Sequence, residues 1–368
     1  MKKGTLSYKK SGVDYDLLDP VKKLAQFEGL KTGNNLKNTA FSEVEDSRGE
    51  SAYIIEMSDC YLAFVVEGLG SKNLIADEMS KITGKTYYDT IGFDTVISIV
   101  MDLSTVGAKP LSVLSYWALG DSKWLKDKKR VTSFIQGWKK ACNEVGISWG
   151  GGETPVLKDI IYPDRIDLAG AAIGIIKPKN RLILGNKLKR GDVIILFESS
   201  GIHVNGLTLA RKLVEKLPNG FSTKLPSGNL YGEALMIPTK SYTILVEDLL
   251  SEEVEIHYMV NITGHGWRKL MRPKKPFSYV LEKVPPVSEL FKFIQKYSAL
   301  SDKEMYGTFN MGAGFAAYVN PKDSDKVLKI SQKHNIKAWV AGRVEKGQKK
   351  VVIQPLNILF QEKDLQIR

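Results

Sequence analysis

Apolar segments of strand and helix type follow one another in two successive blocks, and this order limits the possible folds more than any other feature. Both blocks mix strands and helices without the regular strand–helix alternation of a doubly wound sheet, which favours an α+β fold. In the first block we expect strands at 52–57, 61–66, 111–118 and 168–176, with helices at 93–106 and 131–145. In the second we expect strands at 193–197, 279–281, 315–319, 337–344 and 350–353, with helices at 206–216, 241–250, 288–297 and 324–333.

A stretch rich in turn residues and charges, 177–192, separates the two blocks. The chain has 368 residues, a length that accommodates two domains. Residues 1–50 are polar and irregular, which indicates a flexible N-terminal arm. The expected organisation is therefore an arm at 1–50, domains at 51–178 and 179–355, and a tail at 356–368.

Composition narrows the function classes. No apolar run approaches the ~18 residues of a membrane-spanning helix, and no signal-peptide pattern opens the chain, so a cytoplasmic protein without membrane contact is expected. Cys60 and Cys142, the only cysteines, have neither disulfide nor zinc-ligand spacing. The net charge of +12 suits a phosphorylated small molecule, whereas the lysines are scattered, so no nucleic-acid partner is expected.

A glycine-rich segment, Glu67 to Lys72, directly follows the strand at 61–66. Gly68 and Gly70 let the backbone approach an anion, the Ser71 hydroxyl can donate to it or bind magnesium, and Lys72 supplies a positive charge. The segment lacks the spacing of a P-loop, and a purely structural hairpin is the alternative reading.

Three aspartates, Asp89, Asp94 and Asp102, belong to the next helical segment. Asp94 and Asp102 are about 80° apart around a helix, so both carboxylates can lean toward one side and bind magnesium. Asp89 or Asp94 can alternatively cap the helix. Asp102 lies within an apolar stripe, where a carboxylate is costly unless it is paired or metal-bound.

Four further polar or glycine-rich loops occur at 150–154, 199–206, 263–266 and 308–314. The loop at 199–206 lies between a strand and a helix, where unpaired helix amides favour an anion. His203 and Asn205 can orient a substrate there, and a purely structural histidine is the alternative.

The order of these elements resembles the aminoimidazole ribonucleotide synthase (phosphoribosylformylglycinamidine cyclo-ligase) family over nearly the whole chain. The segments that carry the resemblance begin with Tyr8-Lys9-Lys10-Ser11-Gly12-Val13-Asp14 and Asp89-Thr90-Ile91-Gly92-Phe93-Asp94, and continue with the segments 102–111, 151–154, 167–170, 191–193, 199–206, 263–266 and 304–314.

The resemblance implies a homodimer of two-domain subunits, with N-terminal sheets forming a barrel at the interface and a C-terminal α/β sandwich. It also implies that ATP, bound with Mg2+ between the domains, phosphorylates the formyl amide oxygen of formylglycinamidine ribonucleotide. An amidine nitrogen then closes the imidazole ring, releasing ADP and phosphate.

Combined with the motifs, the resemblance assigns roles to individual residues. Catalytic roles fall to Lys72, His203 and Glu153, and metal binding to Glu67, Asp94 and Asp102. The cofactor-binding set is Lys9, Gly68, Gly70, Ser71, Lys72, Asp89, Asp94 and Gly152. The substrate-binding set is Ser199, Ser200, Gly201, His203, Asn205, Thr263 and Asn310.

The chain also departs from the family pattern near the expected substrate. Glu67 replaces Asp, Met101 replaces Asn, His265 replaces Gly, and the segments starting at Asn38 and Pro155 differ. Two alternatives therefore remain open, a relative that phosphorylates another amide or phosphate-bearing substrate, and a non-catalytic nucleotide-binding protein. Selenophosphate synthases and carbamoyl-dehydratase maturation enzymes are disfavoured, because this chain lacks the reactive N-terminal and C-terminal cysteines of those groups.

Overall fold

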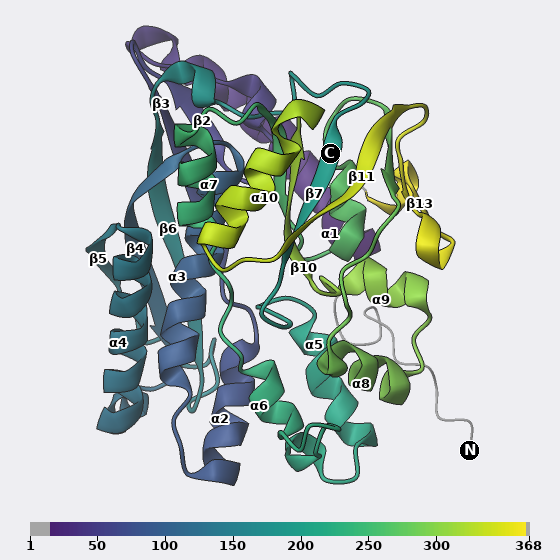
Figure 1. Ribbon diagram of the computed structural model, residues 1–368. Helices are drawn as coiled ribbons and strands as arrows, with labels where there is room; N and C mark the ends of the chain where they lie inside the picture. Colours follow the sequence, from purple (N-terminus) through teal and green to yellow (C-terminus); the bar gives the residue numbers. More distant parts are fainter. Residues whose placement is uncertain (1–14, 366–368) are drawn as a thin grey trace.

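The computed structural model describes residues 15–365, which form two β-sheets with their covering helices (Figure 1). The predicted mixture of strands and helices in each half of the chain is confirmed. Helices α3 (Tyr88–Thr105) and α7 (Thr243–Ser251) contact each other, so the two halves meet along helices as well as loops.

The first sheet has six strands in the order β1-β2-β3-β6-β4-β5, antiparallel except for the parallel pair β4–β5. Antiparallel pairing of β2 with β3 confirms the predicted strand pair. The small residues of β6 fit its place in the middle of the sheet. The strands are β1 (Ser42–Glu43), β2 (Tyr53–Glu56), β3 (Tyr61–Gly68), β4 (Lys109–Leu119), β5 (Ser148–Glu153) and β6 (Ile166–Ile176).

Two long helices cover one face of this sheet. Helix α3 packs on β3, β4 and β6, and α4 (Lys128–Val145) packs on α3. Gly92 and Gly137 lie at the helix crossing, where a Cβ on Gly137 would come within 1.9 Å of the Asp89 carbonyl oxygen. Helix α4 ends at Gly146 in the left-handed conformation, as its sequence predicts.

The other face of the first sheet has an apolar surface without a helix over it among residues 15–365. Val66 on β3 is 75% exposed, and Leu114 and Tyr116 on β4 are also exposed. Monomeric proteins seldom leave large apolar patches in water.

The second sheet has seven strands in the order β13-β12-β9-β11-β7-β10-β8. It is antiparallel apart from β12 with β9. Strands β7 and β10 are neighbours within the sheet, and every residue of β10 is buried. The strands are β7 (Val193–Glu198), β8 (Ile256–Asn261), β9 (Phe277–Leu281), β10 (Ala313–Val319), β11 (Ala338–Lys346), β12 (Lys350–Ile353) and β13 (Ile358–Gln361).

Helices α7 and α10 pack together beside the second sheet, with α10 against β11 (Figure 1). The predicted helix at 206–216 is shorter than expected, because α5 ends at Lys212 and the chain continues as a 3-10 turn. The other helices are α2 (Lys72–Thr83), α5 (Leu207–Lys212), α6 (Tyr231–Leu235), α8 (Glu289–Ser298), α9 (Asp302–Thr308), α10 (Ser324–Lys333) and the 3-10 helix η8 (Gly266–Met271).

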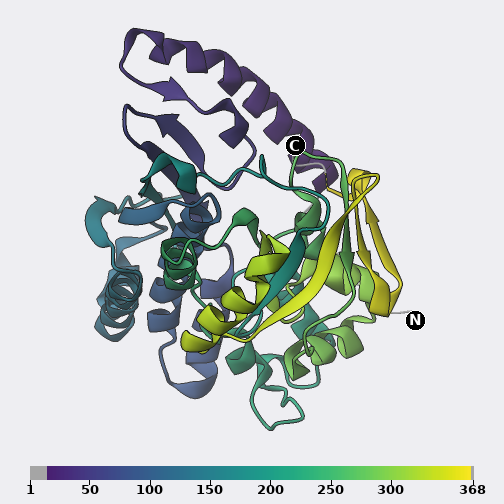
Figure 2. The same cartoon turned by 45° about the horizontal axis from the view of Figure 1, so that its top comes forward.

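Three segments differ from the sequence-based expectations. The arm expected to be irregular contains helix α1 (Tyr15–Thr32), which extends from the edge of the first sheet toward the second (Figure 2). The expected loop at 150–154 is largely edge strand β5, which pairs with β4. The tail beginning at 356 includes β13, which hydrogen-bonds to β12. Flexibility of the arm and the expected domain limits remain predictions.

Candidate functional site

A cavity of about 230 Å³ lies where loops of the first half meet loops of the second. Three of its walls come from the β3–α2 turn, from α3 and from the segment around His203 that precedes α5. The remaining wall is formed by residues that follow β8. The cavity brings together eight of the residues selected from the sequence: Glu67, Gly68, Gly70, Ser71, Asp102, His203, Asn205 and Thr263.

The turn between β3 and α2 forms the first wall. Gly70 has φ of 72°, a left-handed conformation that glycine adopts without strain. The Leu69 amide donates to the Leu168 carbonyl oxygen at 2.8 Å and holds the turn against β6. Ser71 precedes the first residue of α2, so the turn presents its backbone to the cavity next to a helix N-terminus.

One face of α3 forms the second wall, with Ser98, Met101 and Asp102 at helical spacing. Asp102 accepts a hydrogen bond of 2.7 Å from the Asn261 side-chain amide at the end of β8. The sequence-based expectation that Asp102 needs a polar partner is thus met by a residue 159 positions later. The buried Asn261 Oδ1 has no hydrogen-bond partner in the described part of the chain.

A lysine that the sequence reading overlooked, Lys269 in η8, also lines the cavity. Its ammonium group donates to the Thr263 hydroxyl. Burial lowers the pKa of Lys269 to about 8, and nearby Arg272 contributes, while Asp102 and Glu67 act in the opposite direction. Loss of solvent, followed by the negative charge of Asp102, raises the pKa of Glu67. The cavity therefore combines two carboxylates and one ammonium group.

The loop before α5 forms a third wall. His203 is buried with φ of 61°, and its Nε2 accepts a hydrogen bond from the Ser200 amide at 3.3 Å. Burial, with smaller contributions from two lysines, lowers the pKa of His203 to about 3, so the imidazole is neutral near pH 7. Gly206 has φ of 80° and lies against Phe309, whose ring would be 2.4 Å from an added Cβ.

Lys72 and Asp94 lie outside this cavity and form a buried ion pair of 2.5 Å, each side chain being 0% exposed. Asp94 also accepts a hydrogen bond from the Thr239 amide at 2.7 Å, and Lys72 donates to the Ile237 carbonyl oxygen at 2.9 Å. Both Asp94 oxygens thus have protein donors. The expected metal-binding group of Glu67, Asp94 and Asp102 is not formed, because Asp94 is paired with Lys72 while Glu67 and Asp102 line the cavity.

Other selected residues also lie outside the cavity. Asp89 is exposed in the first turn of α3, and Gly152 and Glu153 are on edge strand β5. Ser199 donates to Asn310 Oδ1 at 2.9 Å, and the Asn310 amide donates to the Gly201 carbonyl oxygen at 2.8 Å. The Ser200 hydroxyl donates to the Pro238 carbonyl oxygen. Lys9 lies outside the described residues.

The oxygen atoms of the cavity fit Mg2+. Within residues 15–365 no group of three or more histidine, cysteine or acidic side chains forms a metal cluster. Magnesium nevertheless commonly binds through one or two carboxylates together with substrate phosphates and water. Glu67, Asp102 and the unpartnered Asn261 Oδ1 offer such a set, and the carboxylates come from different elements.

Sequence reasoning overlooked Asn261 and Lys269 for different reasons. Asn261 ends a fully buried strand, and only the tertiary fold brings it to Asp102. Lys269 follows the selected loop 263–266 by three residues, so extending that motif through the next turn would have included it. Lys22 of α1 acts electrostatically on both Glu67 and Lys269, so α1 lies close to the same site.

Two family models match most of the chain. "AIR synthase related protein, N-terminal domain" matches residues 49–176, and "AIR synthase related protein, C-terminal domain" matches residues 189–354. Proteins named phosphoribosylformylglycinamidine cyclo-ligase are similar over almost the full length. The one from Methanocaldococcus jannaschii is 35% identical and covers 92% of each chain. The one from Carboxydothermus hydrogenoformans is 35% identical, over 95% of this chain and 98% of its own.

Solved structures with the same fold are more distant in sequence. A chain of a HypE–HypF complex has a TM-score of 0.61 at 18% identity, covering 85% of this chain and 92% of its own. AaThiL, complexed with AMPPCP and TMP, has a TM-score of 0.59 at 16% identity, covering 96% and 97%. The two domain matches and the full-length relatives together show that this chain belongs to the AIR synthase related protein family.

Proposed function

We propose that this protein is an ATP-dependent phosphoribosylformylglycinamidine cyclo-ligase of purine biosynthesis. Relatives with that name match it over 92% or more of its length. The observation that carries the proposal is the cavity in which the β3–α2 turn, Asp102 and the loop at His203 converge. The direct test is turnover of formylglycinamidine ribonucleotide with ATP, measured as ADP and aminoimidazole ribonucleotide released. ATP turnover only with another amide would support the alternative substrate. No turnover with any amide would support a non-catalytic protein.

The cavity residues suggest a division of labour. Glu67, Asp102 and Asn261 would hold Mg2+, which supplies charge neutralisation for the ATP phosphates when bound. Lys269 is the ammonium group that lines the cavity, so we assign to it the phosphate-neutralising role that the sequence suggested for Lys72. In ATP chemistry of this kind the protein mainly positions the reactants. A solved neighbour, HypE, has been described in complex with ATP, which supports ATP as the nucleotide.

The loop at His203 is proposed to position the second substrate. Its neutral imidazole and the Asn205 side chain face the same cavity, so both can contact a substrate through hydrogen bonds without adding charge. The positive charge of the whole chain, +12, would assist capture of a phosphorylated ribonucleotide.

Magnesium should strengthen ATP binding through Asp102. Asp102→Asn keeps an oxygen that can accept from Asn261 but removes the charge that would hold the metal. We expect the magnesium-dependent gain in affinity for a non-hydrolysable ATP analogue to fall at least about tenfold, a change of ~1.4 kcal/mol. Calorimetric titration with and without Mg2+ measures it. Asp325→Asn, an equal charge change on the exposed first turn of α10 and outside every proposed binding set, is the matched control. Unchanged magnesium dependence in Asp102→Asn would exclude this metal site.

We further propose that the chain forms a homodimer through the apolar face of the first sheet. Light scattering should give about twice the 41.0 kDa chain mass. Leu114→Lys should shift the protein to the monomer, because Leu114 on β4 is an exposed part of that apolar face. Leu359→Lys, exposed on β13 of the other sheet, should leave the mass unchanged. A monomeric unmutated protein at micromolar concentration would refute the dimer.

A further inference from the structure

A second cavity, of about 400 Å³, lies at the opposite end of α2 from the first. Ser71, before the start of α2, lines the first cavity, whereas Ser80 and the turn at Gly84 line the second. A twelve-residue helix is ~18 Å long, so the two cavities are separate. The second cavity is completed by the first turn of α4 and by the residues just before β6.

Positive charge predominates around this cavity. Five cationic side chains line it, Lys81, Lys85, Lys129, Arg130 and Arg165, against three carboxylates, Asp77, Asp127 and Asp164. Asp77 already accepts hydrogen bonds from Tyr88 and Arg165, both at 2.8 Å. Asp127 caps α4 by accepting from the Arg130 amide at 3.0 Å. These two carboxylates are therefore engaged in holding the wall. Lys81 is paired with Glu78 at 2.9 Å, so the positive charge without an ion pair among the described residues is that of Lys85 and Lys129.

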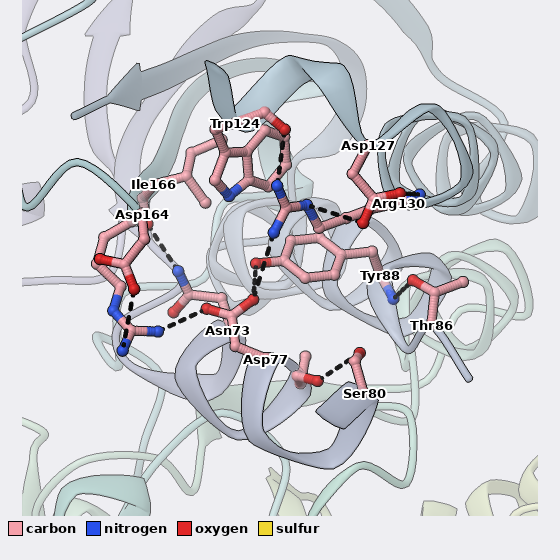
Figure 3. A network of polar contacts seen from close by, with 12 residues as sticks. Asn73, Asp77, Ser80, Thr86, Tyr88, Trp124, Asp127, Arg130, Asp164 and Ile166 are labelled. Carbon is pink, nitrogen blue, oxygen red and sulfur yellow. Dashed lines mark hydrogen bonds and ion pairs between the residues drawn. The ribbon is translucent and has the colours of Figure 1, made fainter. Parts of the chain in front are cut away.

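Arg130 is partly buried, forms the floor of the cavity and lies beside Trp124, Tyr88 and Asp127 (Figure 3). Its guanidinium lies 4.1 Å from the ring centre of Trp124 and donates to the Trp124 carbonyl oxygen at 2.7 Å. The buried Arg130 Nε has no hydrogen-bond partner within residues 15–365 and lies 3.9 Å from the Asp127 carboxylate, which forms an ion pair with it. A guanidinium fixed in this way loses little conformational freedom when it binds an anion.

Two exposed lysines form the rim of the second cavity. Lys85 and Lys129 are exposed, and neither ammonium group has an ion-pair partner among the residues that the structure describes. Lysines of this kind can close around an anion from two sides, one from the turn after α2 and one from α4. Two such ammonium groups match a phosphate group better than a single carboxylate.

We propose that this cavity is a second anion site, which binds a small phosphorylated ligand of the pyrophosphate or nucleoside diphosphate class. Arg130 and Arg165 contact the phosphate oxygens at the floor, and Lys85 and Lys129 bind from the rim. The site lies outside the cavity of the proposed cyclo-ligase reaction, so it stands or falls independently of that activity.

Trp124 provides a local reporter for the test. The chain has six tryptophans, so the full-length protein labelled with 5-fluorotryptophan gives resonances that can be assigned by Trp→Phe variants. Titration with pyrophosphate should move the Trp124 resonance saturably. The double variant Lys85→Gln/Lys129→Gln, which changes only exposed side chains, should weaken this response about tenfold or more.

Lys329→Gln/Lys333→Gln, an equal charge change on exposed positions of α10, should leave the response unchanged. Three results would overturn the site: no saturable shift at Trp124, a shift reproduced by chloride at equal ionic strength, or equal affinity in both double variants. A shift confined to Trp267, which lies in η8 beside Lys269, would place pyrophosphate in the first cavity and overturn the proposal as well.

Discussion

Asp94→Asn should lower the free energy of unfolding by about 3–5 kcal/mol, because it leaves the Lys72 ammonium group buried without a counter-charge. Burial raises the pKa of Asp94 despite the neighbouring Lys72, which indicates that ionising the pair inside the protein brings little net stabilisation. The cost of the single substitution is thus mainly the cost of an unpaired charge. Urea denaturation monitored by circular dichroism measures the change.

The double variant Lys72→Met/Asp94→Asn separates this explanation from a general loss of packing. Removing both charges should restore most of the stability lost in Asp94→Asn, since the asparagine oxygen can still accept from the Thr239 amide. Glu78→Ala, which breaks an exposed ion pair with Lys81 on the same α2, should cost under about 1 kcal/mol. Equal losses in the single and double variants would contradict the unpaired-charge account.

Gly137→Ala should lower the free energy of unfolding by about 3 kcal/mol, although alanine is normally the better helix former by ~1 kcal/mol. The added Cβ would lie 1.9 Å from the Asp89 carbonyl oxygen and 2.7 Å from its Cα, both backbone atoms that no rotamer change can move. To remove this clash, α3 and α4 must move apart. That movement loosens the packing between the buried rings of Phe134 and Trp138.

Gly307→Ala is the matched control, because Gly307 is also buried in a helix but an added Cβ there would be 3.5 Å from its nearest neighbour, the Phe360 ring. We expect that variant to be unchanged or slightly more stable. Thermal and urea unfolding of both proteins distinguish the cases. A Gly137→Ala protein as stable as the unmutated chain would show that the helices can move apart without cost.

The sequence predicted the central strands and long helices because their apolar patterns are local properties of the chain. Strand β6 and helix α4 appear within a few residues of their expected limits. Helix α1 was overlooked, although Leu17, Val21 and Leu24 have helical spacing, because polar residues and asparagines dominate the flanking segment. All three side chains are exposed in the structure, so they do not form the buried stripe that would mark α1 as part of the core.

The sequence predicted which loops form the site, but not which side chains pair with one another there. Glycine and hydroxyl residues of the β3–α2 turn reach the cavity as their sequence suggests. Asp94 and Asp102 have similar sequence surroundings, yet Thr239 and Asn261, each more than 140 positions later, hold them in different environments. A helical projection shows which residues share a face, whereas the partner of each carboxylate depends on the tertiary fold.

The long separation between Asp102 and Asn261 has a consequence for synthesis of the protein on the ribosome. At roughly 5–20 residues per second, the 159 positions between them take on the order of 10–30 s to translate. During that interval the first half can fold, but Lys72 and Asp94 lack their partners until Ile237 and Thr239 have been synthesised. The nascent chain therefore has no complete first cavity, and this cavity is assembled only after the loop carrying Lys269 has left the ribosome.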